Sequence, residues 1–408
     1  MCWGAVDYYG SWTNIEALGR AVFLLSLAAF ASAASLRATD PLLPLIAVEY
    51  GVTTGAASAA VTAFALSYGL LQVVCGPLGD RYGRYRTIAS AAFVSAFGSA
   101  ACALAPSLNA LIAARFVAGA TIGAFIPLAL AWIGDTVAYE RRQPLLARFL
   151  VGQMAGVAFG TAAAGWLAEH FGWRAIFFAM AALLLLIALL LFTELGINPL
   201  TRRAGKPISV RESFRRMPGL LRQRRLQVLL GTAFVEGSLI FGALAFVALH
   251  FQTRFALGPG VAGTLVALYA AGGLVYAVLA RRAVRRLGEQ GLVLAGGAAL
   301  AVGYLLLASS PWVALGTLGI AAVGAGFYML HTTVQIHVTQ VAPEERGSAV
   351  ALFATFLFFG QASGVWLAAR LVDTVGLAPV FVCAALGLAL LAVLFRYAAF
   401  RYVLSGGT

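Results

Sequence analysis

Long apolar stretches dominate this chain, and short polar segments separate them. Each stretch is long enough to cross the hydrocarbon core of a bilayer as a helix, which satisfies every backbone N–H and C=O group internally. Turns at Pro106 and Pro311 divide two of the longest apolar regions. The pattern predicts an all-α membrane protein with twelve transmembrane helices, at residues 19–47, 53–76, 87–106, 109–134, 145–168, 174–193, 226–251, 260–280, 290–309, 312–340, 347–370 and 376–399.

The composition excludes an ordinary soluble domain. Only 11% of the residues are charged and the mean hydropathy is +0.91, whereas about 25% of a soluble domain is charged. The sequence carries no nucleotide-binding G-x-x-x-x-G-K-[ST] loop, metal-ligand cluster or nucleophile arrangement, and its four cysteines are scattered. We therefore expect neither an enzyme nor ATP-driven transport, and neither a cofactor nor a bound metal.

The basic residues predict the orientation in the membrane. The net charge of +13 does not indicate nucleic acid as a partner, because 22 of the 28 Lys and Arg residues lie in the tail and in the connections on the side of the termini. Cytoplasmic loops are enriched in such residues. The first twenty residues lack the features of a cleaved signal peptide. We expect a multi-pass protein of the cell inner (plasma) membrane with both termini in the cytoplasm.

One polar stretch interrupts the series of spans in the middle of the chain. It divides the sequence into residues 1–195, a basic cytoplasmic linker at 196–225, and residues 226–408. Within the linker, apolar residues recur among arginines at near-helical spacing, which suits a helix lying along an anionic leaflet. A solvated basic linker that serves only topology is an equal alternative. The apolar residues concerned are Phe214, Met217, Leu220 and Leu221.

The two halves match one another at a shift of about 204 residues. Gly156 and Gly160 fall on Gly360 and Gly364, and the elements around them follow in the same order. Such a repeat predicts two pseudo-symmetric six-helix bundles that enclose a binding site and open alternately to each side of the membrane.

A compact charged motif, "GPLGDRYGRYRT", lies between the second and third spans. It resembles the G-x-L-x-D-R-x-G-R-R signature of the major facilitator superfamily, although Tyr85 replaces the last basic residue. The resemblance implies the major facilitator fold and secondary transport by alternating access. It also implies that Asp80 contacts the helix that begins near Ser348 and so closes an inner gate; the alternative is that these charges only set topology. The matching residues include Gly76, Asp80, Arg81, Gly83 and Arg84.

Charges inside predicted spans are candidate functional groups, because a charge in the membrane core is costly. Arg37 and Asp40 share a helix face, and "RATDPLLP" resembles the first helix of proton-coupled drug exporters of the superfamily, as Arg115 resembles their fourth-helix arginine. A substrate that competes for the arginines would then link its binding to protonation of Asp40. The alternatives are a structural ion pair near the outer surface and, for Arg115, a packing role.

The second half contributes further candidates. Glu236 is either a second proton site or a residue that reaches toward the inner interface. His331 and Gln335 share a face of the tenth span, where His331 binds a ligand or donates an interhelical hydrogen bond. Gln72 and Gln361 are additional candidates for the wall of a cavity.

These features predict a monomeric secondary transporter, and specifically a proton-coupled exporter of small organic compounds in the lipid bilayer. The antiporter motif G-P-x-x-G-G of the fifth helix is here "GTAAAG", so antiport is less firmly indicated than transport. One alternative is a carrier of anionic metabolites, by uptake or exchange, and a more remote one is a membrane receptor that transports nothing.

Overall fold

The computed structural model describes residues 12–137, 139–202, 217–341 and 346–398, all of which form helices or short connections between helices. The first half places six spans in order. The first span joins α1 (Trp12–Arg37), the 3-10 helix η1 (Asp40–Leu42) and α2 (Leu43–Tyr50). The others are α4 (Ala59–Tyr82) preceded by the short α3 (Thr54–Ala57), α5 (Arg84–Ala103), α6 (Leu108–Ile122) with α7 (Phe125–Thr136), α8 (Tyr139–Phe171) and α9 (Arg174–Ile197).

The second half repeats this order. After the 3-10 turn η2 (Pro199–Arg202), the linker residues 203–216 lie outside the described part of the chain. Met217 and Leu220 are buried and Leu221 is exposed, whereas Phe214 is not described, so the interfacial helix and the linker boundaries stay predictions. The spans are α11 (Arg224–Leu244) with α12 (Val247–Phe255), α13 (Pro259–Ser309), α14 (Val313–Val341), α15 (Arg346–Thr374) and α16 (Leu377–Ala398).

The described helices account for twelve spans. Ten helical segments of the described residues meet a length and hydropathy criterion for crossing a membrane. Helix α13 counts twice, because its 51 residues turn at Gly288, whose φ of 63° is accessible to glycine. Helix α5 completes the set, although its arginines and small residues lower its hydropathy. The predicted spans therefore match the helices to within several residues, and the eighth and ninth are joined at a kink at Gly288, where the backbone is not helical.

The first span of each half is broken in its second half. Pro41 and Pro44 accompany the break between α1 and α2, as expected from the missing backbone donor of proline. The matching span of the second half breaks at Ala245 and Phe246, without proline. Because breaks free backbone groups from the helical pattern, these positions are suited to lie beside polar groups in a transporter.

Glycines set the packing of the first and fifth spans in each half. A Cβ added at Gly156 of α8 would meet the carbonyl of Phe30, and one added at Gly160 would meet that of Ala34. In the second half, Gly360 and Gly364 of α15 meet the carbonyls of Phe234 and Ser238 in the same way. The partners differ by 204 residues in every case, so the predicted repeat is a repeat of packing as well as of sequence.

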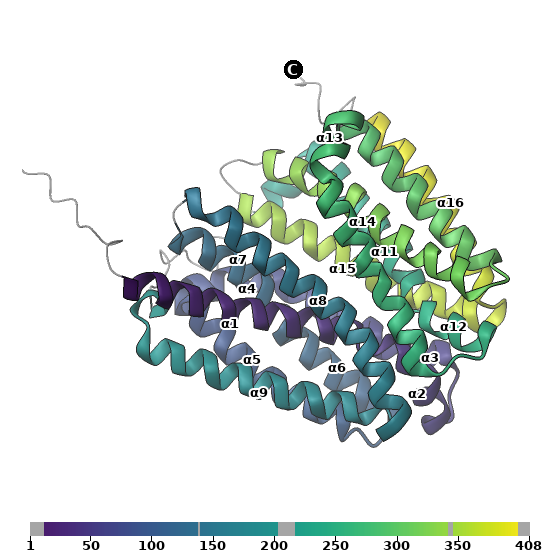
Figure 1. Ribbon diagram of the computed structural model, residues 1–408, viewed down its shortest axis with the longest axis horizontal. Coiled ribbons are helices and arrows are strands. Elements are labelled where there is room, and N and C mark those ends of the chain that lie inside the picture. The colour runs from purple at the N-terminus through teal and green to yellow at the C-terminus, as the bar shows by residue number, and fades with distance from the viewer. Residues whose placement is uncertain (1–11, 138, 203–216, 342–345, 399–408) are drawn as a thin grey trace, which may run out of the picture.

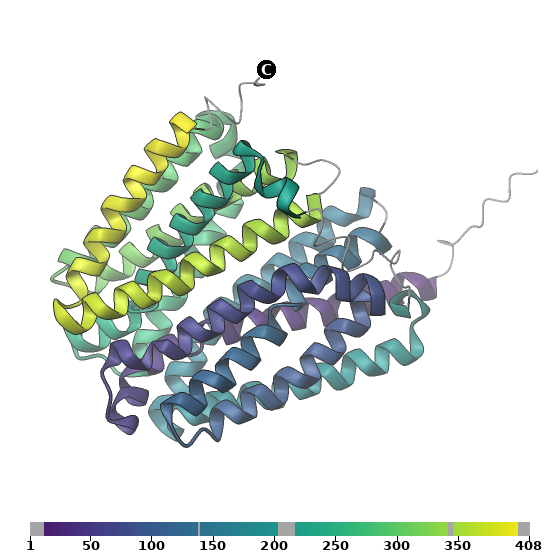
Figure 2. The same cartoon turned by 180° about the vertical axis from the view of Figure 1, so that it is seen from behind.

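The largest contacts between the halves are those of α4 with α15 and of α8 with α13, and further contacts join α3 to α15 and η1 to α12 and α13. In Figure 1 the helices of the first half run beneath those of the second, and the two sets approach each other near α3 and α12. Seen from behind, in Figure 2, the sets again separate toward the ends at which α1 begins and α16 finishes. We call the face with these ends the terminal face, and the other the opposite face.

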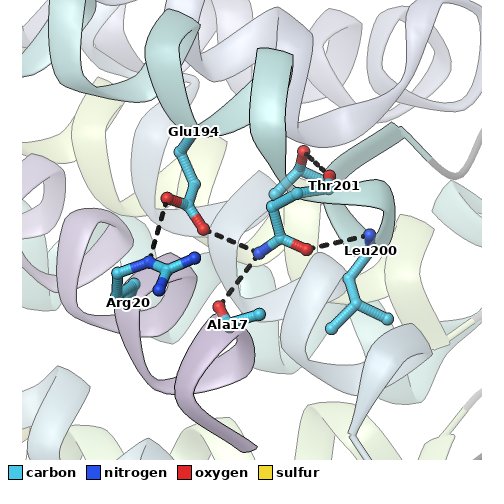
Figure 3. A network of polar contacts seen from close by, with 6 residues as sticks. Ala17, Arg20, Glu194, Leu200 and Thr201 are labelled. Atoms are coloured by element: carbon cyan, nitrogen blue, oxygen red, sulfur yellow. Dashed lines mark hydrogen bonds and ion pairs between the residues drawn. The ribbon is translucent and has the colours of Figure 1, made fainter. Parts of the chain in front are cut away.

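A polar network fastens the first half at its terminal face (Figure 3). Glu194 near the end of α9 is buried and lies 3.4 Å from Nε of Arg20 on α1. The amide of Asn198 donates to Glu194 at 2.7 Å and to the carbonyl of Ala17 at 2.9 Å. The network therefore joins the first and last spans of the bundle, and gives the buried Glu194 a structural role.

Candidate substrate and gating sites

Arg37 and Asp40 form a buried ion pair at the break in the first span. Nη1 of Arg37 lies 3.3 Å from Oδ2 of Asp40, and the two residues are 2% and 0% exposed. Arg37 is the last residue of α1 and Asp40 the first of η1, so the break keeps both side chains on one side. The pair therefore lies in the protein interior.

Several polar atoms around this pair have no hydrogen-bond partner among the described residues. They are Nη2 of Arg37, Oδ1 of Asp40 and Oγ1 of Thr39. An unsatisfied buried polar atom costs free energy, and such atoms gather where a water, an ion or a substrate group binds. The ion pair consequently keeps donor and acceptor atoms that are available to a ligand.

Arg115 is buried in the same half but bonds differently from Arg37. Its guanidinium donates to the carbonyl of Ser35 at 3.2 and 3.3 Å, and to that of Ala60 at 3.5 Å. It also stacks over the ring of Phe64, at 3.9 Å from the ring centroid. These contacts brace α6 against α1 and α4, which agrees with the packing role that the sequence left open.

Glu236 and His331 form a second polar pair, between α11 and α14. Oε2 of Glu236 lies 3.4 Å from Nδ1 of His331. Glu236 is 0% exposed, and its other oxygen has no partner in the described part of the chain. The side chain thus does not extend to the inner interface. Gln361 on α15 is also fully buried, and both atoms of its amide are unpartnered among the described residues.

Aromatic rings connect the two polar pairs across the halves. The Arg37 guanidinium lies 4.5 Å from the ring centroid of Phe241 on α11. Phe241 meets Phe327 at 5.2 Å, and Phe327 stacks on His331 at 4.7 Å between centroids. We call Phe241 and Phe327 the aromatic bridge. The sequence analysis missed both, because an isolated phenylalanine in an apolar helix carries no signal of its contacts.

The two remaining glutamines are placed differently. Gln72 of α4 is buried and donates to the carbonyl of Gly123 at 3.4 Å. Because Gly123 lies at the break between α6 and α7, Gln72 satisfies a carbonyl that the helix leaves free. Gln335 is half-buried one turn after His331 on α14.

The charged motif forms a tight junction within the first half. Gly83 has a φ of 89° and connects α4 to α5, where a side chain would be strained. Asp80 accepts hydrogen bonds from Arg84 at 3.0 and 3.2 Å, and Arg84 also pairs with Asp135 at 2.5 Å. Arg81 lies over the ring of Tyr82, and a Cβ at Gly76 would meet open space.

The predicted contact between Asp80 and the helix near Ser348 is not among these bonds. Within the described residues, the hydrogen bonds of Asp80 go to Arg84 of its own half. Residues 342–345, which precede α15, lie outside the described part of the chain. The inner contact therefore stays a prediction about another conformation.

Known proteins resemble this chain in sequence and in fold. The family model described as Major Facilitator Superfamily matches residues 25–365. The putative uncharacterized transporter YgaY of Escherichia coli (strain K12) is 28% identical over 87% of this chain and 90% of its own length. The multidrug export protein EmrB of Haemophilus influenzae is 28% identical over 42% of this chain and 34% of its own length. The crystal structure of the nucleoside transporter NupG superposes with a TM-score of 0.75, at 15% identity, over 94% of this chain and 99% of that one.

The superposition on NupG shows that the helices are arranged in the same way in both proteins. The family match spans both halves of this chain. Two bundles of six helices, the signature between the second and third spans and the family match point to one conclusion. This chain belongs to the Major Facilitator Superfamily, and it is a multi-pass secondary transporter of small molecules, not an enzyme.

Proposed function

We propose that this transporter exports small organic compounds in exchange for protons, and that Asp40 carries the proton. The observation that supports this most strongly is the environment of Asp40. Its carboxylate is fully buried, pairs with Arg37 through one oxygen, and has no described partner at the other. A carboxyl group in such a place changes its protonation when the charges and hydrogen bonds around it change.

The arrangement gives a physical route from substrate to proton. A cationic or hydrogen-bond-donating substrate group that binds the unpartnered oxygen of Asp40 favours the ionised carboxylate and so displaces its proton. A proton bound at Asp40 in turn removes the charge that holds the substrate group, and it frees Arg37 to interact with the ring of Phe241. By linkage, each ligand then lowers the affinity for the other by the same factor, which is the sign that exchange requires.

The activity of one relative agrees with this direction of transport. EmrB of Haemophilus influenzae is a multidrug export protein, and it aligns with less than half of this chain. The alignment favours export as the first activity to test.

Flux in proteoliposomes tests the proposal. A panel of fluorescent organic cations, neutral compounds and anions is loaded, and an imposed pH gradient drives transport. We expect the gradient to drive flux of at least one cationic or neutral probe, and Asp40→Asn to abolish that dependence. The matched control is Glu16→Gln, which removes an exposed acid from α1 of the same span. Flux that ignores the gradient in the parent protein would refute proton coupling.

A carrier of anionic metabolites is a second candidate. It is favoured by the excess of buried arginine in the first half, where Arg37 and Arg115 accompany the single acid Asp40 around the break. In the same assay, this carrier would transport organic anions and would be inhibited by them, whereas cations would not compete. Binding of a probe without any flux would indicate a receptor and would contradict both candidates.

A further inference from the structure

We propose that Glu169 and Asp373 form two equivalent latches that hold the opposite face closed. In each latch, an acid near the end of a helix in one half binds a backbone amide at the start of a span in the other half. The inference goes beyond the proposed coupling, because it concerns the conformational change and not the transported species. We call these contacts the Glu169 latch and the Asp373 latch.

The Asp373 latch joins α15 to the segment before α4. Oδ1 of Asp373 accepts a hydrogen bond from the backbone N–H of Gly55 at 3.0 Å. Oδ2 accepts one from the hydroxyl of Thr53 at 2.7 Å. Thr53 also accepts from the N–H of Ala56, so its side chain is held in place at the start of α3. One carboxylate therefore makes two bonds to the other half.

The Glu169 latch joins α8 to the start of α13. Oε2 of Glu169 accepts a hydrogen bond from the backbone N–H of Gly260 at 2.9 Å. Gly260 lies in the first turn of α13, whose free amides and dipole favour a negative charge. One turn earlier on α8, the indole of Trp166 donates to the hydroxyl of Thr264 at 3.1 Å. The same two helices are therefore bonded at two levels.

The two latches are related by the internal repeat of the chain. Asp373 follows Glu169 by 204 residues, and Gly260 follows Gly55 by 205. The shift that aligns the glycine packing of the two halves therefore also aligns the acids, and it aligns the amides to within one residue. The same type of contact at symmetry-related positions argues against two accidental surface bonds.

Both receiving positions are glycines that lie close to the other half. A Cβ added at Gly55 would lie 2.6 Å from the carbonyl oxygen of Ala369. A Cβ added at Gly260 would lie 2.6 Å from Oε2 of Glu169 and 3.0 Å from the ring of Trp166. The absence of a side chain allows the backbone amide to reach the carboxylate.

The latches lie on the face away from the chain ends, where the two sets of helices approach each other (Figure 1). Gln252 of α12 adds a bond to the carbonyl of Pro41, at 3.0 Å, between the same halves. On the terminal face, by contrast, Asp80 bonds to Arg84 within its own half. In this structure the two halves are therefore hydrogen-bonded to one another at the opposite face. Opening that face requires both latches to break.

Distances between spin labels test the latches without substrate or gradient. Val48 on α2 and Val375 after α15 are exposed residues of different halves on the opposite face. Labels are attached at Val48→Cys and Val375→Cys in a background without other cysteines, in lipid nanodiscs. Double electron–electron resonance then compares the parent with Glu169→Ala, Asp373→Ala and the double variant.

We expect one dominant short distance in the parent protein. Both acids are exposed, and a charge-assisted hydrogen bond between exposed groups changes an equilibrium by about fivefold or less. Each single variant should therefore raise the ratio of the longer-distance population about two- to fivefold, and the double variant should raise it further. Asp373→Asn and Glu169→Gln, which keep an acceptor, should fall between their alanine variants and the parent. Glu16→Gln should leave the distances unchanged.

Gly55→Ala provides an independent variant, because it leaves both carboxylates in place and displaces the backbone that one of them binds. It should open the face as Asp373→Ala does, even if the double variant fails to fold. Identical distance distributions in the parent, Gly55→Ala and both single alanine variants would overturn the proposal. That result would leave proton coupling untouched, just as a flux assay without proton dependence would leave the latches untouched.

Discussion

The buried pair of Arg37 and Asp40 predicts a large coupling energy. At the observed 3.3 Å, two unit charges attract one another by about 5 kcal/mol when the effective dielectric constant is about 20. Removing one member of a buried pair leaves the other charge uncompensated and costs about 3–5 kcal/mol, whereas replacing both is often nearly neutral. Asp40→Asn and Arg37→Met should each destabilise the protein by about 3 kcal/mol, and the double variant by about 1 kcal/mol.

Unfolding of the purified protein in detergent, followed by intrinsic fluorescence against denaturant, measures this cycle. The matched control is the pair of Glu49 and Arg174, whose side chains are 39% and 33% exposed. The same cycle with Glu49→Gln and Arg174→Met should give a coupling below about 1 kcal/mol, because water screens exposed charges. A coupling for Arg37 and Asp40 as small as the control would mean that water already surrounds the pair, and would refute its burial.

Three further predictions follow from the packing and from the second polar pair. Gly156→Ala should destabilise the protein by about 1–3 kcal/mol, because the added methyl meets the carbonyl of Phe30. The control is Gly134→Ala, whose methyl faces open space and should leave the stability unchanged. Equal unfolding midpoints for the two variants would contradict this packing. Phe241→Leu should cost about 0.5–2 kcal/mol in the same assay by removing the ring beneath Arg37, and Phe241→Tyr should cost less. Glu236→Gln should lower flux at least tenfold while its unfolding midpoint changes little, since one oxygen already lacks a described partner; unchanged flux would assign Glu236 a structural role only.

The sequence was sufficient for most of the fold, because the bilayer imposes a strong rule on helix length and polarity. Gly83 could be predicted as a turn and Pro41 as a break, since each has a local backbone cause. The short kink at Gly288, with helix on both sides of it, could not be predicted, because a charged loop and the charged end of a helix have the same composition.

The candidate site was predictable only where its partners lie on one helix. The spacing of Arg37 and Asp40 places them together in any helical geometry. The carbonyl partners of Arg115, the contact between Glu236 and His331, and the aromatic bridge all depend on how separate helices pack. Glu169 and Asp373 escaped notice because an acid at the end of a span resembles any solvated loop residue until its partner in the other half is known.

Proton release on ligand binding tests the central claim most directly. The purified transporter is mixed, in weakly buffered solution with a pH indicator, with the probe that the flux panel identifies as transported. Wild-type protein should release protons as the probe binds, because the probe and the proton compete for the pair of Arg37 and Asp40. Asp40→Asn should bind the probe without release. Equal proton release from the wild type and Asp40→Asn, or none from either, would contradict coupling through Asp40.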